Sequence, residues 1–154
     1  MKARGIVLTA VVCFFAVAIC LAADAFTGTW KLNEAKSKLA GGAAKNTTVI
    51  YEAMGDEVKI TVEGVDAEGK PTHNEWTGKF DGKDYPVTGD ATSDARAYVK
   101  VNAHTLTFTA KKDGKVTLTG RITVSKDGKT RTVTTAATDE MGKKVSNTAV
   151  YDKQ

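Results

Sequence analysis

The sequence predicts an all-β protein, an antiparallel up-and-down β-barrel of about 8–10 strands that follows an N-terminal signal peptide. Three observations support this fold class. The N-terminal segment differs in character from the rest of the chain. Turn signals recur throughout the remainder, and the segments between them alternate polar and apolar residues and are rich in threonine and valine.

The first segment has the pattern of a secretory signal peptide. Lys2 and Arg4 precede an almost unbroken apolar run over residues 5–21, and small residues follow it. That run is shorter than the roughly 20 residues that span a membrane as a helix. We therefore expect residues 1–23 to be a signal peptide, residues 24–154 to form a single domain, and the location to be periplasmic or extracellular. The alternatives are a lipoprotein anchored through Cys20, although the bulky Ile19 precedes it, and an uncleaved N-terminal anchor.

Composition restricts the chemistry of the exported domain. Cys13 and Cys20 both lie in the apolar run, so we expect no disulfide and no thiol chemistry in the domain. Beyond the signal segment, 20 basic residues face 18 acidic ones and the lysines are scattered, which argues against nucleic-acid binding. His73 and His104 supply too few ligands for a metal or a haem. We expect no cofactor and, since no serine lies in a nucleophile motif, no enzyme activity.

Turn signals separate the predicted strands. Asp-Gly steps occur at residues 81–82, 113–114 and 127–128, and such steps fit the tight turns that join antiparallel strands. The segments between turns carry the residues that favour a pleated sheet. In chain order, the predicted strands cover residues 28–33, 46–54, 57–65, 71–80, 84–88, 95–102, 104–111, 115–125, 129–138 and 144–152.

Alternation and short connections predict how these strands assemble. Val58, Ile60 and Val62 share one face of their strand and polar residues share the other, which is typical of a sheet with one dry face. Short connections favour an up-and-down order, and closure into a barrel removes the exposed edges. A two-sheet sandwich remains the alternative. Residues 33–45 form the one stretch that could be helical, and the pair Gly41 and Gly42 limits a helix there to a turn or two.

The two ends of the domain resemble the calycin superfamily. Residues 24–32, Asp-Ala-Phe-Thr-Gly-Thr-Trp-Lys-Leu, resemble the first strand of the intracellular fatty-acid-binding proteins and the Gly-x-Trp opening of the lipocalins. Residues 47–60 are similar to the second hairpin of the fatty-acid-binding proteins, and residues 148–153 resemble their last strand. The resemblance implies a barrel with one mouth and an interior that holds an apolar ligand, with Gly28 and Trp30 at the closed end. Residues 33–45 are too short for the helical pair that usually lids the mouth in that family.

The resemblance also implies residues that bind the ligand. Fatty-acid-binding proteins often hold a carboxylate with Arg-x-Tyr in the last strand; here Tyr151 is present and Ala149 replaces the arginine. A second family arginine corresponds to Arg121, although alternation with Ile122 would point Arg121 to solvent, and both orientations remain open. Arg131 has the same ambiguity. Trp76 and Tyr98 are among the large side chains available to line the interior.

Together these observations predict an exported, monomeric binding protein that holds a small apolar or amphipathic molecule, similar to a fatty acid, inside a β-barrel. The alternative is a barrel with a filled interior that acts as an interaction module for a protein or for the cell envelope.

Overall fold

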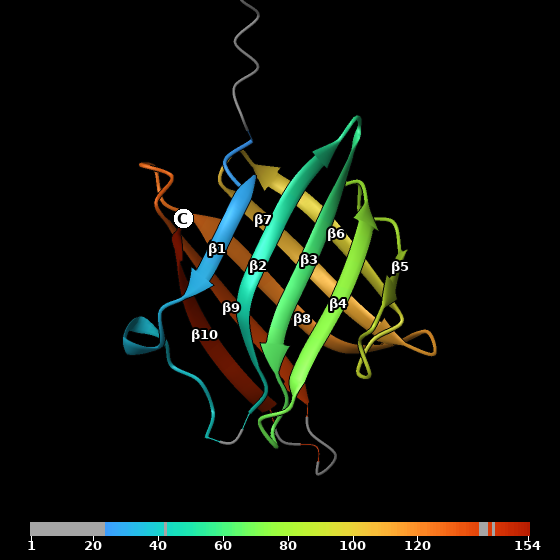
Figure 1. Cartoon of the computed structure of the whole chain (residues 1–154). Coiled ribbons are helices and arrows are strands. Elements are labelled where there is room, and N and C mark those ends of the chain that lie inside the picture. The colour runs from blue at the N-terminus through green and yellow to red at the C-terminus, as the bar shows by residue number, and fades with distance from the viewer. Residues whose placement is uncertain (1–23, 42, 139–141, 143) are drawn as a thin grey trace, which may run out of the picture.

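A computed structural model describes residues 24–41, 43–138, 142 and 144–154 (Figure 1). The predicted signal peptide lies outside the described residues. One 3-10 turn, η1 (Glu34–Lys36), accompanies ten strands: β1 (Gly28–Leu32), β2 (Lys45–Met54), β3 (Glu57–Val65), β4 (Pro71–Gly78), β5 (Tyr85–Thr88), β6 (Ala95–Asn102), β7 (Thr105–Lys112), β8 (Lys115–Val124), β9 (Thr130–Thr138) and β10 (Lys144–Lys153).

The strands form a closed antiparallel barrel in which each strand pairs with its neighbours in the sequence. The first and last strands complete the ring, with Trp30 opposite Lys153 and Leu32 opposite Tyr151. This arrangement confirms the predicted up-and-down barrel and excludes the sandwich. Between β1 and β2 lies the short turn η1, which Asn33 caps by accepting a hydrogen bond from the Lys36 amide.

Trp30 of β1 lies opposite Lys153, next to the last residue, and both described termini lie at this end of the barrel (Figure 1). The side chain of Trp30 is 0% exposed, and the indole Nε1 donates a 2.8 Å hydrogen bond to the carbonyl of Phe26. The Lys153 ammonium covers the indole ring, 5.1 Å from its centroid. Gly28 adopts a φ of +118°, and a Cβ there would lie 3.0 Å from Lys153 Cε. Trp30 and Gly28 therefore both help to close this end of the barrel, and the interior opens at the opposite end.

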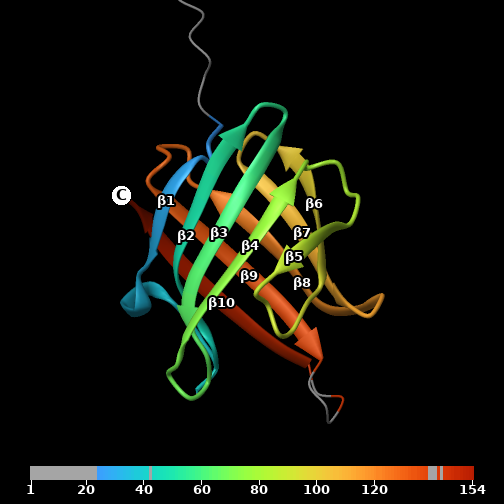
Figure 2. The ribbon, with the colours of Figure 1, turned by 45° about the vertical axis from the view of Figure 1, so that its right-hand side comes forward.

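Strand β5 forms the fewest residue pairs with its neighbouring strands. It pairs with β4 only through Val87 and Thr88, and with β6 only through Tyr85 and Pro86. Figure 2 shows β5 and its connections at the side of the barrel. The loop over residues 89–94, which follows β5, lies at the end of the barrel opposite the described termini. Among the described residues, no helix is long and apolar enough to cross a membrane.

Candidate functional site

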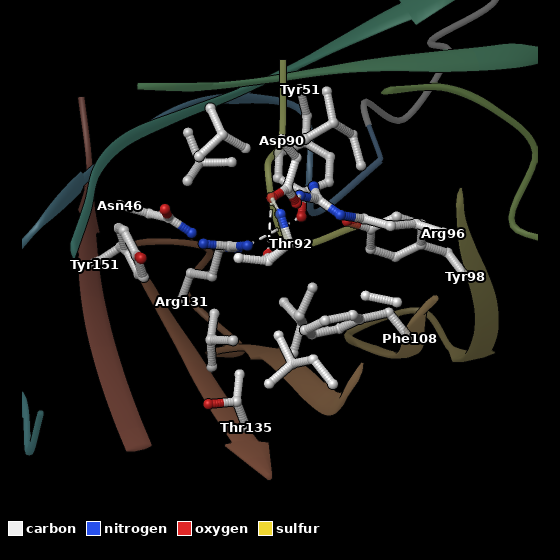
Figure 3. Close-up of a pocket in the computed structure, with 17 residues that line it drawn as sticks. Asn46, Tyr51, Asp90, Thr92, Arg96, Tyr98, Phe108, Arg131, Thr135 and Tyr151 are labelled. Atoms are coloured by element: carbon white, nitrogen blue, oxygen red, sulfur yellow. Dashed lines mark hydrogen bonds and ion pairs between the residues drawn. The ribbon is translucent and has the colours of Figure 1, made fainter. Parts of the chain in front are cut away.

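Two adjoining cavities occupy the barrel. An inner cavity of about 110 Å³ lies among the strands (Figure 3), and a mouth cavity of about 390 Å³ extends from it toward the open end. Asp90, Thr92, Arg96 and Tyr151 are among the residues that line both cavities. A molecule that enters through the mouth can therefore reach the inner cavity.

Inward-facing positions of the strands give the inner wall both apolar and polar side chains. Seven strands contribute, mostly through alternate residues, so the same period-two pattern that marks the sequence builds this surface. The aliphatic members of the lining and its one phenylalanine are Val49, Ile60, Val62, Phe108, Ala110, Leu118, Ile122 and Val133.

Arg131 of β9 places a positive charge in this buried interior. It is 4% exposed, and Figure 3 shows its guanidinium pointing into the cavity. Its Nη2 donates a 3.0 Å hydrogen bond to the hydroxyl of Tyr51, and its guanidinium carbon lies 4.8 Å from the ring centroid of Tyr151. Its Nε and Nη1 have no hydrogen-bond partner, and no carboxylate of the described residues forms an ion pair with it. Two donors of a buried cation are thus unused.

The neighbouring tyrosines do not neutralise this charge. Burial raises the pKa of Tyr51 to about 12, an effect that the nearby Arg131 charge only partly opposes. Burial also raises the pKa of Tyr151 above its ordinary value. Both phenols are therefore protonated at neutral pH, and Arg131 remains an uncompensated cation. Burial of a charge without a partner is costly, so the site favours an anion that can use the two unused donors.

A second arginine that lines the cavities is already paired. Arg96 of β6 forms a 2.5 Å ion pair with Asp90, and both side chains are 13% exposed. Asp90 also accepts hydrogen bonds from the hydroxyls of Thr92 and Ser93. Burial raises the pKa of Asp90, but hydrogen bonds from Ser93, Thr92 and Arg96 outweigh burial and lower the pKa to about 2. The pair is therefore ionised and electrically neutral overall at neutral pH.

The structure brings three of the predicted ligand-binding residues together. Arg131, Tyr151 and Tyr98 all line the inner cavity. The side chain of Trp76 lies elsewhere: it is buried in an aromatic cluster, 4.7 Å from Tyr98 between ring centroids, and its indole donates to the carbonyl of Arg96. Trp76 does not line the inner cavity, because neighbouring aromatic rings enclose its indole.

Arg121 lies on the outer face of β8. It is exposed, whereas Ile122 beside it is buried and lines the inner cavity. An interior position for Arg121 is therefore wrong, and the alternation along its strand gives the physical reason. The same alternation places Arg131 on the inner face of β9, which it shares with Val133.

Sequence analysis did not assign a ligand-binding role to several polar residues of the site. Tyr51 is among the large side chains that the sequence makes available to line or fill the interior, and it alternates with the inward-facing Val49. Arg96 carries the same signal, because it is two residues before Tyr98 on β6. Asp90 carries no such signal, since it lies in the loop that follows β5. Asn74 is also buried, lines the mouth cavity, and has a side-chain oxygen without a hydrogen-bond partner. In the described part of the chain, no cluster of three or more His, Cys, Asp or Glu side chains could hold a metal ion.

The fold and site together define a closed ten-stranded antiparallel β-barrel with an interior cavity. No known protein family matches the chain, and no curated protein matches it. Among solved structures it is similar to EF1p2_mFAP2b bound to DFHBI, with 13% identity over 86% of this chain and 97% of that chain and a TM-score of 0.48. It is also similar to a redesigned beta barrel, mFAP1, bound to DFHBI, with 15% identity over 84% and 95% of the two chains and a TM-score of 0.44.

Proposed function

We propose that the barrel binds one small amphipathic acid, with the acidic group against Arg131 and the apolar part along the inner wall. The observation that carries this proposal is the buried guanidinium of Arg131, which has two unused donors and no carboxylate partner among the described residues. A carboxylate matches the planar fork of an arginine and would satisfy both the charge and the hydrogen bonds.

The apolar wall would supply most of the affinity. Each methylene group that leaves water contributes about 0.8 kcal/mol, which is close to a fourfold gain in affinity. The affinity of a series of linear acids should therefore rise with chain length until the chain fills the space between Arg131 and the mouth.

The remaining features of the proposal come from the sequence. The resemblance of residues 24–32 and 148–153 to the fatty-acid-binding proteins and lipocalins supports a calycin-like carrier of a fatty-acid-like molecule. The N-terminal pattern supports export to a periplasmic or extracellular location. We further propose that the protein acts as a monomer, that it is not an enzyme, and that it binds no nucleic acid.

A competition assay tests the acid site. The purified protein is loaded with a fluorescent fatty-acid analogue, which is then displaced by decanoate or by decanol. A charge-assisted hydrogen bond contributes about 1.5–3 kcal/mol, so decanoate should displace the dye at a concentration at least about tenfold lower than decanol. Arg131→Met should remove this preference and leave the two competitors nearly equal.

Arg121→Met is the matched control, because it removes the same charge from the outer face of the adjacent strand. The control should keep the preference for decanoate. Equal displacement by the acid and the alcohol in the unaltered protein would contradict an acid site at Arg131. A protein that takes up no dye at all would favour the alternative, a barrel that interacts through its outer surface.

A further inference from the structure

We infer that the barrel selects ligands with a single acidic group, and that Asp90 is the residue that sets this limit. This inference rests on the proposed function and adds the charge of the ligand to it. It follows from the way in which the cations around the two cavities are paired.

Three cationic side chains line the two cavities in the described part of the chain, and two of them are in ion pairs. Lys45 lines the mouth cavity and forms an ion pair with Glu34, with 2.7 Å between Nζ and Oε2. Arg96 is paired with Asp90. Arg131 alone has no acidic partner among the described residues. The interior therefore offers one positive charge to an incoming molecule.

The Asp90–Arg96 pair also lies where the far end of a ligand would pass. Both residues line the inner cavity and the mouth cavity, whereas Arg131 lines only the inner one. A molecule that places its acid at Arg131 and extends toward the mouth must run past the pair. A second carboxylate there would lose its water and would meet Asp90, whose charge already satisfies Arg96.

Hydrogen bonds hold Asp90 firmly in this role. Its Oδ1 accepts from the amide and the hydroxyl of Thr92, at 2.8 and 2.7 Å, and its Oδ2 accepts from Ser93. Asp90 therefore remains in place as a fixed negative charge that keeps Arg96 from binding a second acid. Replacing Asp90 with a neutral residue of the same shape should release Arg96 as a second anion site.

The test compares decanoate with decanedioate, which has a carboxylate at each end. Affinity for each acid is measured by displacement of the fluorescent analogue in the unaltered protein, in Asp90→Asn and in Arg96→Gln. The readout is the ratio of the two affinities. The unaltered protein should bind decanoate at least about tenfold more tightly, an amount that corresponds to about 1.4 kcal/mol.

The two variants should move this ratio in opposite directions. Asp90→Asn releases Arg96, so decanedioate should gain at least about tenfold relative to decanoate. Arg96→Gln removes the cation that neutralises Asp90, so the affinity for decanoate relative to decanedioate should increase. If Asp90→Asn does not fold, Arg96→Gln still decides the matter, because an unchanged ratio in that variant overturns the inference.

Asp84→Asn is the control for a change of net charge. Asp84 forms a 2.6 Å ion pair with Lys111, and neither residue lines a cavity. This control should keep the ratio of the unaltered protein, and a shift as large as that of Asp90→Asn would overturn the role of Asp90. Equal affinity of the unaltered protein for both acids would overturn the selection alone, whereas failure to bind decanoate would overturn the proposed function itself.

Discussion

Two arginines ten positions apart show how the orientation of one side chain decides its role. Arg121 and Arg131 lie on the adjacent strands β8 and β9, yet one faces solvent and the other faces the cavity. The outer arginine is hydrated. The inner one is 4% exposed and has no carboxylate partner among the described residues, so its charge costs stability and becomes useful when an anion binds.

The cost of the inner charge should be measurable. Arg131→Met keeps most of the side-chain volume and removes the buried charge, so the free energy of unfolding of the ligand-free protein should rise by about 1 kcal/mol or more. Urea unfolding monitored by tryptophan fluorescence gives this value. Arg121→Met should stay within about 0.5 kcal/mol of the unaltered protein. A loss of stability in Arg131→Met would mean that the contacts with Tyr51 and Tyr151 outweigh the cost of the charge.

The buried Tyr51 predicts a loss of stability in alkali. Burial raises its pKa from 10.0 to about 12 in the folded protein. The folded state therefore holds this proton more tightly than the unfolded state does. The stability that the protonated phenol contributes is fully present below a pH of about 10 and is lost as the pH rises through about 12, a change on the order of 2–3 kcal/mol.

Urea unfolding at a series of alkaline pH values tests this effect against Tyr51→Phe. The variant lacks the ionisable hydroxyl, so its stability should decline less steeply over the same range. Parallel curves for the two proteins would rule out Tyr51 as the source of the decline.

At the scale of the elements, turn chemistry located the strands well. Three Asp-Gly steps lie between successive strands, and the predicted and observed limits of the strands differ by only a residue or two. For the loop over residues 89–94, turn signals predict the turn but not the positions of its side chains. Its sequence marks a turn, but the position of Asp90 beside Arg96 depends on hydrogen bonds to Thr92 and Ser93 that no strand pattern encodes.

Strand β8 depends on a glycine at one inward-facing position. A Cβ on Gly120 would lie 2.3 Å from Cε1 of Phe108 and 3.0 Å from the carbonyl oxygen of Thr134. Gly120→Ala must therefore displace the Phe108 ring, which lines the inner cavity, at a cost of about 1–3 kcal/mol in the free energy of unfolding. Thermal or urea unfolding measures the cost.

Gly41→Ala is the comparison for this substitution, because a Cβ at Gly41 would have no atom within 4 Å. Its effect should be small. A Gly120→Ala protein as stable as Gly41→Ala would show that the Phe108 ring moves at little cost.

At the scale of the whole molecule, closure followed from the strand count and the short connections, because a meander of ten strands must deal with two edges. The contents of the barrel did not follow from the sequence. Whether an interior is filled or hollow depends on how side chains from opposite walls meet, and Trp76 illustrates this: it faces inward, but its neighbours Phe80 and Tyr98 cover it. The inner cavity and the position of Arg131 in it depend on side chains from many strands, so they could be described only in the complete barrel.

The pairing of β1 with β10 has a practical consequence for handling the protein. Asp24 and Gln154 both lie at the end sealed by Trp30, on the opposite side of the barrel from the mouth (Figure 1). A tag, a fluorescent partner or a surface linker attached beyond either of these residues would sit at the pole away from the entrance. Immobilised barrels would therefore present their entrances outward, an orientation suited to a sensor.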